Sequence, residues 1–167
     1  VFDELIFQPL NMNDTFFEVP VDKVSKFCSL YTRTSAESLK RLENAKDSRF
    51  CENVKMYSGG GGLISSMQDY LVFLEMIRCG GQYNNARVLG RKTVELMLRN
   101  HLPGDMASMG QPTFSEMPMA GIGFGLGGAI LLDPAKAQIL GSEGAFTWGG
   151  MASTAFWIDP VEEITVV

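Results

Sequence analysis

The tripeptide Trp148-Gly149-Gly150 is the stretch of this sequence whose residue types most directly suggest chemistry. Glycine weakens a β-strand, and it is tolerated where another backbone or a ligand must approach closely. The tryptophan beside the two glycines supplies a large flat wall with one N–H donor. The pattern indicates one wall of a binding site, although a β-bulge beside a core tryptophan would explain these three residues as well.

His101 is the only histidine, and a hydrolase could use it as a general base. It stands in the stretch Asn100-His101-Leu102-Pro103, directly after an expected helix end, and no nucleophile partner is evident. We therefore expect a helix-capping or surface role for this side chain.

Three further patterns favour structural roles. The four glycines at 59–62 lack the Gly-Lys-Ser/Thr of a phosphate-binding loop, so they are interpreted as a tight entry to a following helix. Tyr83-Asn84-Asn85 matches Tyr-x-Asn but comes directly after a Gly-Gly pair, in an expected turn. The three cysteines are widely spaced, with no CxxC pair. They predict buried or half-buried thiols rather than a zinc site, and nothing in the sequence supports a metal or an organic cofactor.

The clearest expected helix begins after Ser66, where apolar residues recur at i, i+3, i+4 and i+7, and ends at Gly80-Gly81. A second helix is expected at about 91–99. Shorter helices are expected before Pro9, which should stop the first of them, and after Pro20, through Phe27 and Cys28. Residues 31–56 are polar without a period, which predicts an irregular surface excursion.

The last third of the chain changes character. Residues 103–120 are rich in proline, glycine and methionine and are expected to form a loop. Three strand regions follow at about 121–132, 146–158 and 164–167, separated by Asp133-Pro134 and Asp159-Pro160 turns. Strands joined by short turns predict an antiparallel sheet. Helices followed by such a sheet make the expected class α+β.

Composition places the chain among globular proteins, because 46% of its 167 residues are hydrophobic and 20% are charged. The net charge of −5 argues against a general binder of nucleic acid or of anionic membranes. No apolar run approaches the roughly 20 residues that a membrane span needs.

Several stretches together resemble the family VIII carboxylesterases and their class C β-lactamase relatives, within the penicillin-binding-protein superfamily. They follow the family's order and cover nearly the whole chain. The stretches are 6–16 (IFQPLNMNDTF), 61–66 (GGLISS) with Asp69-Tyr70, 100–103 (NHLP), 123–127 (GFGLG), 147–150 (TWGG) and 156–160 (FWIDP).

The resemblance implies a serine hydrolase that forms an acyl-enzyme on a small ester or amide substrate. Trp148, Gly149 and Gly150 would fill its third motif, and the backbone N–H of Met151 would be one of two oxyanion-hole donors. Trp in place of the lysine of that motif removes a cation that would hold a substrate carboxylate. That exchange favours esters over penicillins.

One departure from the family is large: no lysine in the chain has a serine three residues before it, so the nucleophile motif Ser-x-x-Lys is absent. In the family this motif and the motif tyrosine lie upstream. The resemblance therefore implies that residues 1–167 are the C-terminal part of a single domain and an incomplete β-lactamase/transpeptidase-like fold, inactive alone. That part would comprise helices to about 102, a loop to about 120 and then the sheet.

Two other functions stay open at this point. One is a non-catalytic binding or scaffolding module of the same fold, and the other is a D-amino-acid peptidase of the same superfamily. An incomplete sheet would leave strand edges unpaired, so self-association between copies is also expected.

Overall fold

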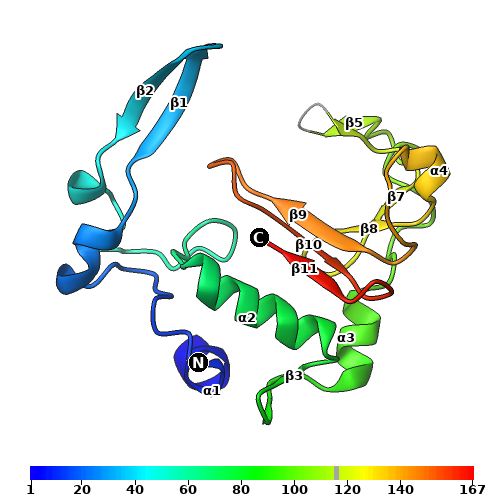
Figure 1. Cartoon of the computed structure of the whole chain (residues 1–167), viewed down its shortest axis with the longest axis horizontal. Helices are drawn as coiled ribbons and strands as arrows, with labels where there is room; N and C mark the ends of the chain where they lie inside the picture. The colour runs from blue at the N-terminus through cyan, green and yellow to red at the C-terminus, as the bar shows by residue number, and fades with distance from the viewer. Residues whose placement is uncertain (115–116) are drawn as a thin grey trace. The chain divides into compact units, whose positions relative to one another are not determined.

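The computed structural model describes residues 1–114 and 117–167. The chain divides into two compact units (Figure 1). The larger unit comprises Val1–Met12 and Met67–Val167, and the smaller unit comprises Asn13–Ser66. The expected assignment of all 167 residues to one domain stays a prediction.

The larger unit is built on an antiparallel five-stranded sheet. Its strands follow the order β11-β10-β9-β8-β7, so each strand pairs with its sequence neighbour. They are β7 (Ile122–Phe124), β8 (Ala129–Leu131), β9 (Phe146–Gly149), β10 (Ala155–Asp159) and β11 (Ile164–Val166). The expected antiparallel meander is confirmed.

Two of the three expected strand regions each contain two strands. The chain turns at Gly127 between β7 and β8 and at Ser153 between β9 and β10, and both residues have positive φ, 97° and 61°. A residue with positive φ cannot continue a strand, so it ends the pairing locally. The sequence shows the apolar content of these regions but not the turns inside them.

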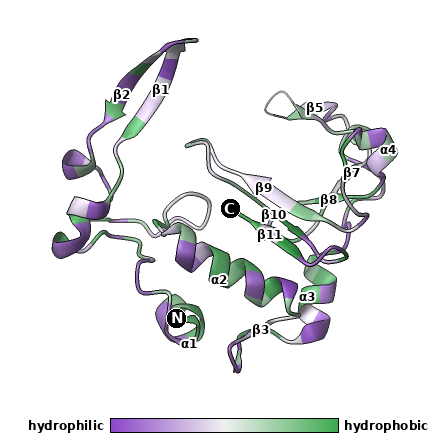
Figure 2. Ribbon diagram, viewed as in Figure 1, coloured by the Kyte–Doolittle hydropathy of each residue, from purple (hydrophilic) through white to green (hydrophobic). Residues whose placement is uncertain are grey.

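Helix α2 (Met67–Arg78) confirms the helix expected after Ser66, and it packs on the sheet. Leu74 and Met76 on this helix have no exposed surface. The helix ends as expected at Gly80 and Gly81, whose N–H groups donate to the carbonyls of Ile77 and Met76. Figure 2 shows apolar residues along α2 and on β10 and β11.

The N-terminal segment corrects one expectation. A π-helical segment, η1 (Asp3–Phe7), leads directly into α1 (Gln8–Leu10), so Pro9 does not stop the helix. Pro9 is the second of the three residues of α1, and Leu10 continues the helix after it. The helix ends instead at Asn11, whose φ of 54° is left-handed.

Short elements complete the larger unit. The helix α3 (Arg91–Met97) confirms the expected second helix. The strands β3 (Gln82–Tyr83) and β4 (Ala86–Arg87) form a hairpin, and α4 (Pro134–Ala137) begins at Asp133, whose carboxylate accepts from two N–H groups of its first turn.

Residues 103–110 form bends and turns, and the hairpin of β5 (Thr113–Phe114) and β6 (Met117–Pro118) follows them. Met119 is buried there and Met106 is half-buried, whereas Met109 and Met117 are exposed.

Two apolar clusters hold the larger unit together. The first joins α1, α2 and α3 to one face of the sheet, with Phe146, Phe156 and Ile158 at its centre. The second is smaller and includes Ala129 and Leu131 from the opposite face of β8, together with residues of α4 and the methionine-rich loop. Since side chains alternate along a strand, the two faces of β8 belong to different clusters.

The smaller unit contains a β-hairpin that the sequence did not predict. Residues 31–56 were expected to be irregular, but β1 (Leu30–Ser35) and β2 (Ser38–Glu43) form an antiparallel hairpin. Nearly every residue of both strands is exposed, so no alternation of apolar and polar residues marks them.

Two short 3-10 helices flank this hairpin, η2 (Val21–Lys26) and η3 (Ala45–Asp47). The helix expected after Pro20 is therefore a 3-10 helix that ends before Phe27 and Cys28. Among the residues that the structure describes, no helix has both the length and the apolar character needed to cross a membrane.

Candidate functional site

The Trp148-Gly149-Gly150 motif lies at the end of β9, where the chain turns back into β10. Gly149 pairs with Ala155 as the last residue of the strand. Gly150 then donates its N–H to Thr154 O over 2.8 Å. The two glycines were expected early in a strand, so their placement is corrected. They end the strand and open a tight hairpin.

The space around the two glycines explains part of their presence. A Cβ on Gly149 would lie 3.1 Å from Thr154 O, and one on Gly150 would lie 2.5 Å from Thr154 Oγ1. The close approach is therefore made by Thr154, the residue before β10 in the same hairpin. The two glycines are therefore explained without a ligand, and any binding site here depends on the neighbouring residues.

Met151 occupies the tip of this hairpin and is fully exposed. Its backbone N–H donates to no group within residues 1–114 and 117–167. An oxyanion-hole donor has to be available in this way, because it must point at charge that develops only in the transition state. Among the described residues, the Met151 N–H thus has no partner, which its expected role would require.

Trp148 is half-buried and is held by two phenylalanine rings. The Phe124 ring meets it edge-on, with centroids 5.0 Å apart and an interplanar angle of 85°. The Phe114 ring stacks on it at 5.2 Å and 20°. Offset stacking and edge-to-face packing are the favoured arrangements of aromatic pairs. Trp148 is therefore one of a group of three packed rings.

Asn100 positions one of these rings, a role that the sequence analysis missed. Its Oδ1 accepts from the N–H groups of Phe124 and Leu102, and its Nδ2 donates to the carbonyls of Leu102 and Gly104. A Cβ on Gly123 would lie 2.5 Å from Asn100 Oδ1. The sequence shows an asparagine after an expected helix and, separately, a glycine-rich strand. Neither stretch by itself predicts that the two are in contact.

His101 has the capping role expected for it. Its Nε2 lies 2.8 Å from Leu96 O, near the end of α3, and its backbone N–H donates to Phe124 O. A helix leaves its last carbonyls without intrahelical partners, and a histidine can bond to one of them. This contact explains His101 without a catalytic role.

Tyr83-Asn84-Asn85 also has a structural explanation. Asn84 and Asn85 form the two-residue turn between β3 and β4, with φ of 43° and 66°. Positive φ at both positions defines a type I′ hairpin turn, in which asparagine is favoured. The motif is part of this turn.

Asp159 is a buried carboxylate at the end of β10. Burial by itself raises the pKa of this carboxyl, but N–H donors from Glu162, Ser142 and Val161 outweigh burial and hold the pKa below its ordinary value. The three bonds close the turn after β10 and tie it to the segment before β9. The turn expected at Asp159-Pro160 is confirmed.

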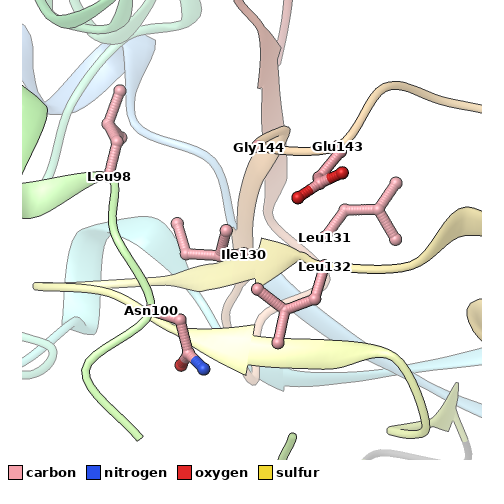
Figure 3. A pocket seen from close by; sticks show the side chains of 7 residues that line it. All are labelled: Leu98, Asn100, Ile130, Leu131, Leu132, Glu143 and Gly144. Carbon is pink, nitrogen blue, oxygen red and sulfur yellow. The ribbon is translucent and has the colours of Figure 1, made fainter. Parts of the chain in front are cut away.

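An open pocket of about 390 Å³ is lined in part by Glu143 and Gly144, which precede β9 in the chain. Leu98, Asn100, Ile130 and Glu143 are among the residues that line it, and Figure 3 shows the Glu143 carboxylate pointing toward its interior. Glu143 precedes the first residue of β9, whereas Trp148 and the glycines are at its end. The pocket lining includes none of Trp148, Gly149, Gly150 and Met151, but it includes Asn100, which also accepts from the N–H of Phe124.

Within the described ranges, no three His, Cys, Asp or Glu residues come together in a group that could hold a metal ion. Cys28, Cys51 and Cys79 are free thiols. Cys51 is half-buried as expected, but Cys28 and Cys79 are exposed, so the expected burial is wrong for these two. Burial raises the pKa of the Cys51 thiol, whose Sγ donates to Ala45 O.

Comparison with known families decides the identity of this architecture. The family model described as Beta-lactamase matches residues 1–167, which is the whole chain. The chain belongs to the beta-lactamase family. The resemblance seen in the sequence is thereby confirmed, together with the expected combination of helices and an antiparallel sheet.

Known proteins similar to this beta-lactamase family member are longer than it is. Protein Rv1367c from Mycobacterium tuberculosis (strain ATCC 25618 / H37Rv) is 29% identical over 175 residues, which cover all of this chain and 41% of that protein. The chain thus spans less than half the length of this curated relative.

Two solved structures show the same fold. EstCE1, a hydrolase with promiscuous acyltransferase activity, aligns with a TM-score of 0.77 at 27% identity, over 98% of this chain and 43% of its own. The LovD6 mutant of simvastatin synthase from Aspergillus terreus also gives 0.77, at 24% identity, over 98% of this chain and 42% of its own. The described sheet and helices therefore correspond to part of a larger β-lactamase-like fold.

Proposed function

We propose that residues 1–167 act as part of a serine hydrolase that cleaves small esters or amides through an acyl-enzyme. The observation that carries the proposal is the free Met151 N–H at the tip of the hairpin that follows Trp148-Gly149-Gly150. Membership of the beta-lactamase family and the likeness to EstCE1, itself a hydrolase, support it. The tryptophan where related enzymes have lysine favours esters.

In this mechanism, attack by a serine oxygen on the substrate carbonyl turns the carbonyl oxygen into an oxyanion. The Met151 N–H would donate to that oxygen, and the N–H of the nucleophile itself would be the second donor, as the family resemblance implies. Loss of one such donor typically lowers kcat by 10²- to 10³-fold. Since the chain contains no Ser-x-x-Lys, the nucleophile would be supplied by residues outside these 167.

A backbone donor can be removed by proline, which has no N–H. Met151 is the first central residue of the turn from Gly150 to Ser153, a position where proline is favoured in type I and type II turns. The variants Met151→Pro and Met151→Ala would be made in the full-length product of the gene that encodes this chain. Their hydrolysis of p-nitrophenyl acetate would then be compared.

We expect Met151→Pro to lower kcat by roughly 10²- to 10³-fold. Met151→Ala keeps the N–H and should retain near-normal activity, because the side chain is fully exposed. Equal activity of the two variants would refute the role of the N–H. Saturable hydrolysis by purified residues 1–167 would refute the proposal that the nucleophile lies elsewhere.

The same assay separates the alternative functions. A panel of esters, cephalosporins and D-alanyl peptides would reveal a D-amino-acid peptidase by turnover of the peptides. A non-catalytic binding module would turn over none of the three, and its full-length sequence would lack Ser-x-x-Lys.

A further inference from the structure

Three aromatic side chains form a continuous group beside the proposed oxyanion donor. We name Phe114, Phe124 and Trp148 the aromatic wall. Phe124 lies on β7, Trp148 on β9 and Phe114 on β5, so elements far apart in sequence contribute to it. The ring contacts are those described above, one stacked and one edge-on.

The two phenylalanines that contact Trp148 differ in how much of their surface is exposed to solvent. Phe124 is half-buried in the second apolar cluster and packs its ring edge-on against Trp148, which fixes the tryptophan in place. Phe114 covers a face of Trp148 but is itself 42% exposed. The outer member of the stack therefore presents apolar ring surface to solvent.

The surface continues beyond the rings. Met117 lies opposite Phe114 in the β5–β6 hairpin and is 53% exposed. Directly opposed side chains of an antiparallel pair lie about 4.5–5.5 Å apart at their Cβ atoms. Methionine packs favourably at aromatic edges because its thioether is polarisable and flexible. A ring placed on Phe114 would thus also meet a side chain that adapts to its shape.

Trp148 lies close in the chain to Met151, the proposed oxyanion-hole donor. Met151 follows Trp148 by three residues, and three residues of chain span at most roughly 10 Å. A group attached to an ester carbonyl at the Met151 N–H, either directly or through the ester oxygen, would therefore lie near the aromatic wall. The ring surfaces can stack on a flat apolar group, and they offer no charge to an ionic one.

We propose that Phe114 and Trp148 form a subsite for the aromatic ring of an aryl ester, with Phe114 as a specificity-determining residue. This inference rests on the proposed function, because the ester would have to sit at Met151. The ring of the substrate would extend the existing stack. One stacked aromatic pair contributes an affinity factor of about 2- to 10-fold.

The two tryptophans of the chain allow a direct binding test on residues 1–167. Trp157→Phe leaves Trp148 as the only source of tryptophan fluorescence, and Trp157 lies on β10 with 47% of its surface exposed. This variant would be titrated with 4-nitroacetophenone, a non-hydrolysable nitroaromatic ketone that quenches a nearby indole. We expect saturable quenching.

Two substitutions at Phe114, made in the Trp157→Phe background, test its part in the site. Phe114→Ala should raise the dissociation constant about 2- to 10-fold. Phe114→Tyr keeps the ring, so its dissociation constant should equal that of the variant with Phe114 intact. Trp148→Phe leaves Trp157 as the reporter, and its quenching should rise linearly without saturation. Linear quenching of Trp148, or equal binding by the alanine and tyrosine variants, would overturn the inference.

A kinetic comparison separates this inference from the proposed function. In the full-length gene product, Phe114→Ala should lower kcat/KM for phenyl acetate about 2- to 10-fold relative to kcat/KM for methyl acetate. Normal hydrolysis with an unchanged ratio would refute the subsite and leave the hydrolase intact. Saturable binding at Trp148 without hydrolysis of any ester would refute the hydrolase and leave the aromatic site.

Discussion

Asn100 and Gly123 offer the sharpest test of how the fold supports the candidate site. The Asn100 side chain makes four hydrogen bonds of 2.9 to 3.2 Å, which join the segment after α3 to the N–H of Phe124. Each such bond contributes about 1 kcal/mol net to stability. Because Asn100 is half-buried and water can replace part of the loss, Asn100→Ala should lower the free energy of unfolding by about 2–4 kcal/mol.

Gly123→Ala should disturb the same contacts from the other side. Its new methyl group would lie 2.5 Å from Asn100 Oδ1 and 2.6 Å from Asn100 Cγ, so the asparagine side chain must move and lose its bonds. We expect a similar loss of about 2–4 kcal/mol. In the double variant the clash with Asn100 is gone, and the total loss should stay within about 1 kcal/mol of that of Asn100→Ala alone.

Urea denaturation followed by circular dichroism would measure all three variants. With a slope of about 2 kcal/mol per molar urea, each single variant should lower the midpoint by roughly 1–2 M. Asn44→Ala is the matched control, because Asn44 makes one side-chain bond, to Asp47, at an exposed site, and it should lose less than about 0.5 kcal/mol. Additive losses from Asn100→Ala and Gly123→Ala would refute the shared network.

Two further predictions concern pH and assembly. The pKa of Asp159 is depressed in the folded chain, so its stabilisation is fully present above the unfolded pKa of about 3.9 and is lost as pH falls through the folded pKa. Asp159→Asn should therefore destabilise the chain at pH 7, and the difference in the free energy of unfolding should narrow as pH falls below about 3.9 in urea titrations. A difference that does not change with pH would contradict this. We also propose that residues 1–167 self-associate through β11, an edge strand on which Ile164 is 47% exposed. Ile164→Lys should reduce association measured by light scattering at high concentration, and a monomeric unsubstituted chain would contradict it.

Local patterns in the sequence determined the elements whose causes are local. The spacing of apolar residues after Ser66 predicts α2, and Gly80-Gly81 predicts its end, because a helix and its C-terminal turn depend on residues a few positions apart. The antiparallel sheet followed from apolar segments separated by short turns. The family followed from stretches of sequence in a fixed order, which the Beta-lactamase model confirms over residues 1–167.

Tertiary structure decided the features that depend on contacts between distant residues. The hairpin of β1 and β2 carries no apolar alternation because both of its faces are exposed. Asn100 reaches Phe124 across 24 positions, and the stacking of Phe114 on Trp148 spans more. Such contacts arise only when the chain returns to the same place in space, so no local period records them. The sequence therefore predicted a wall at Trp148, and only the fold showed which rings complete it.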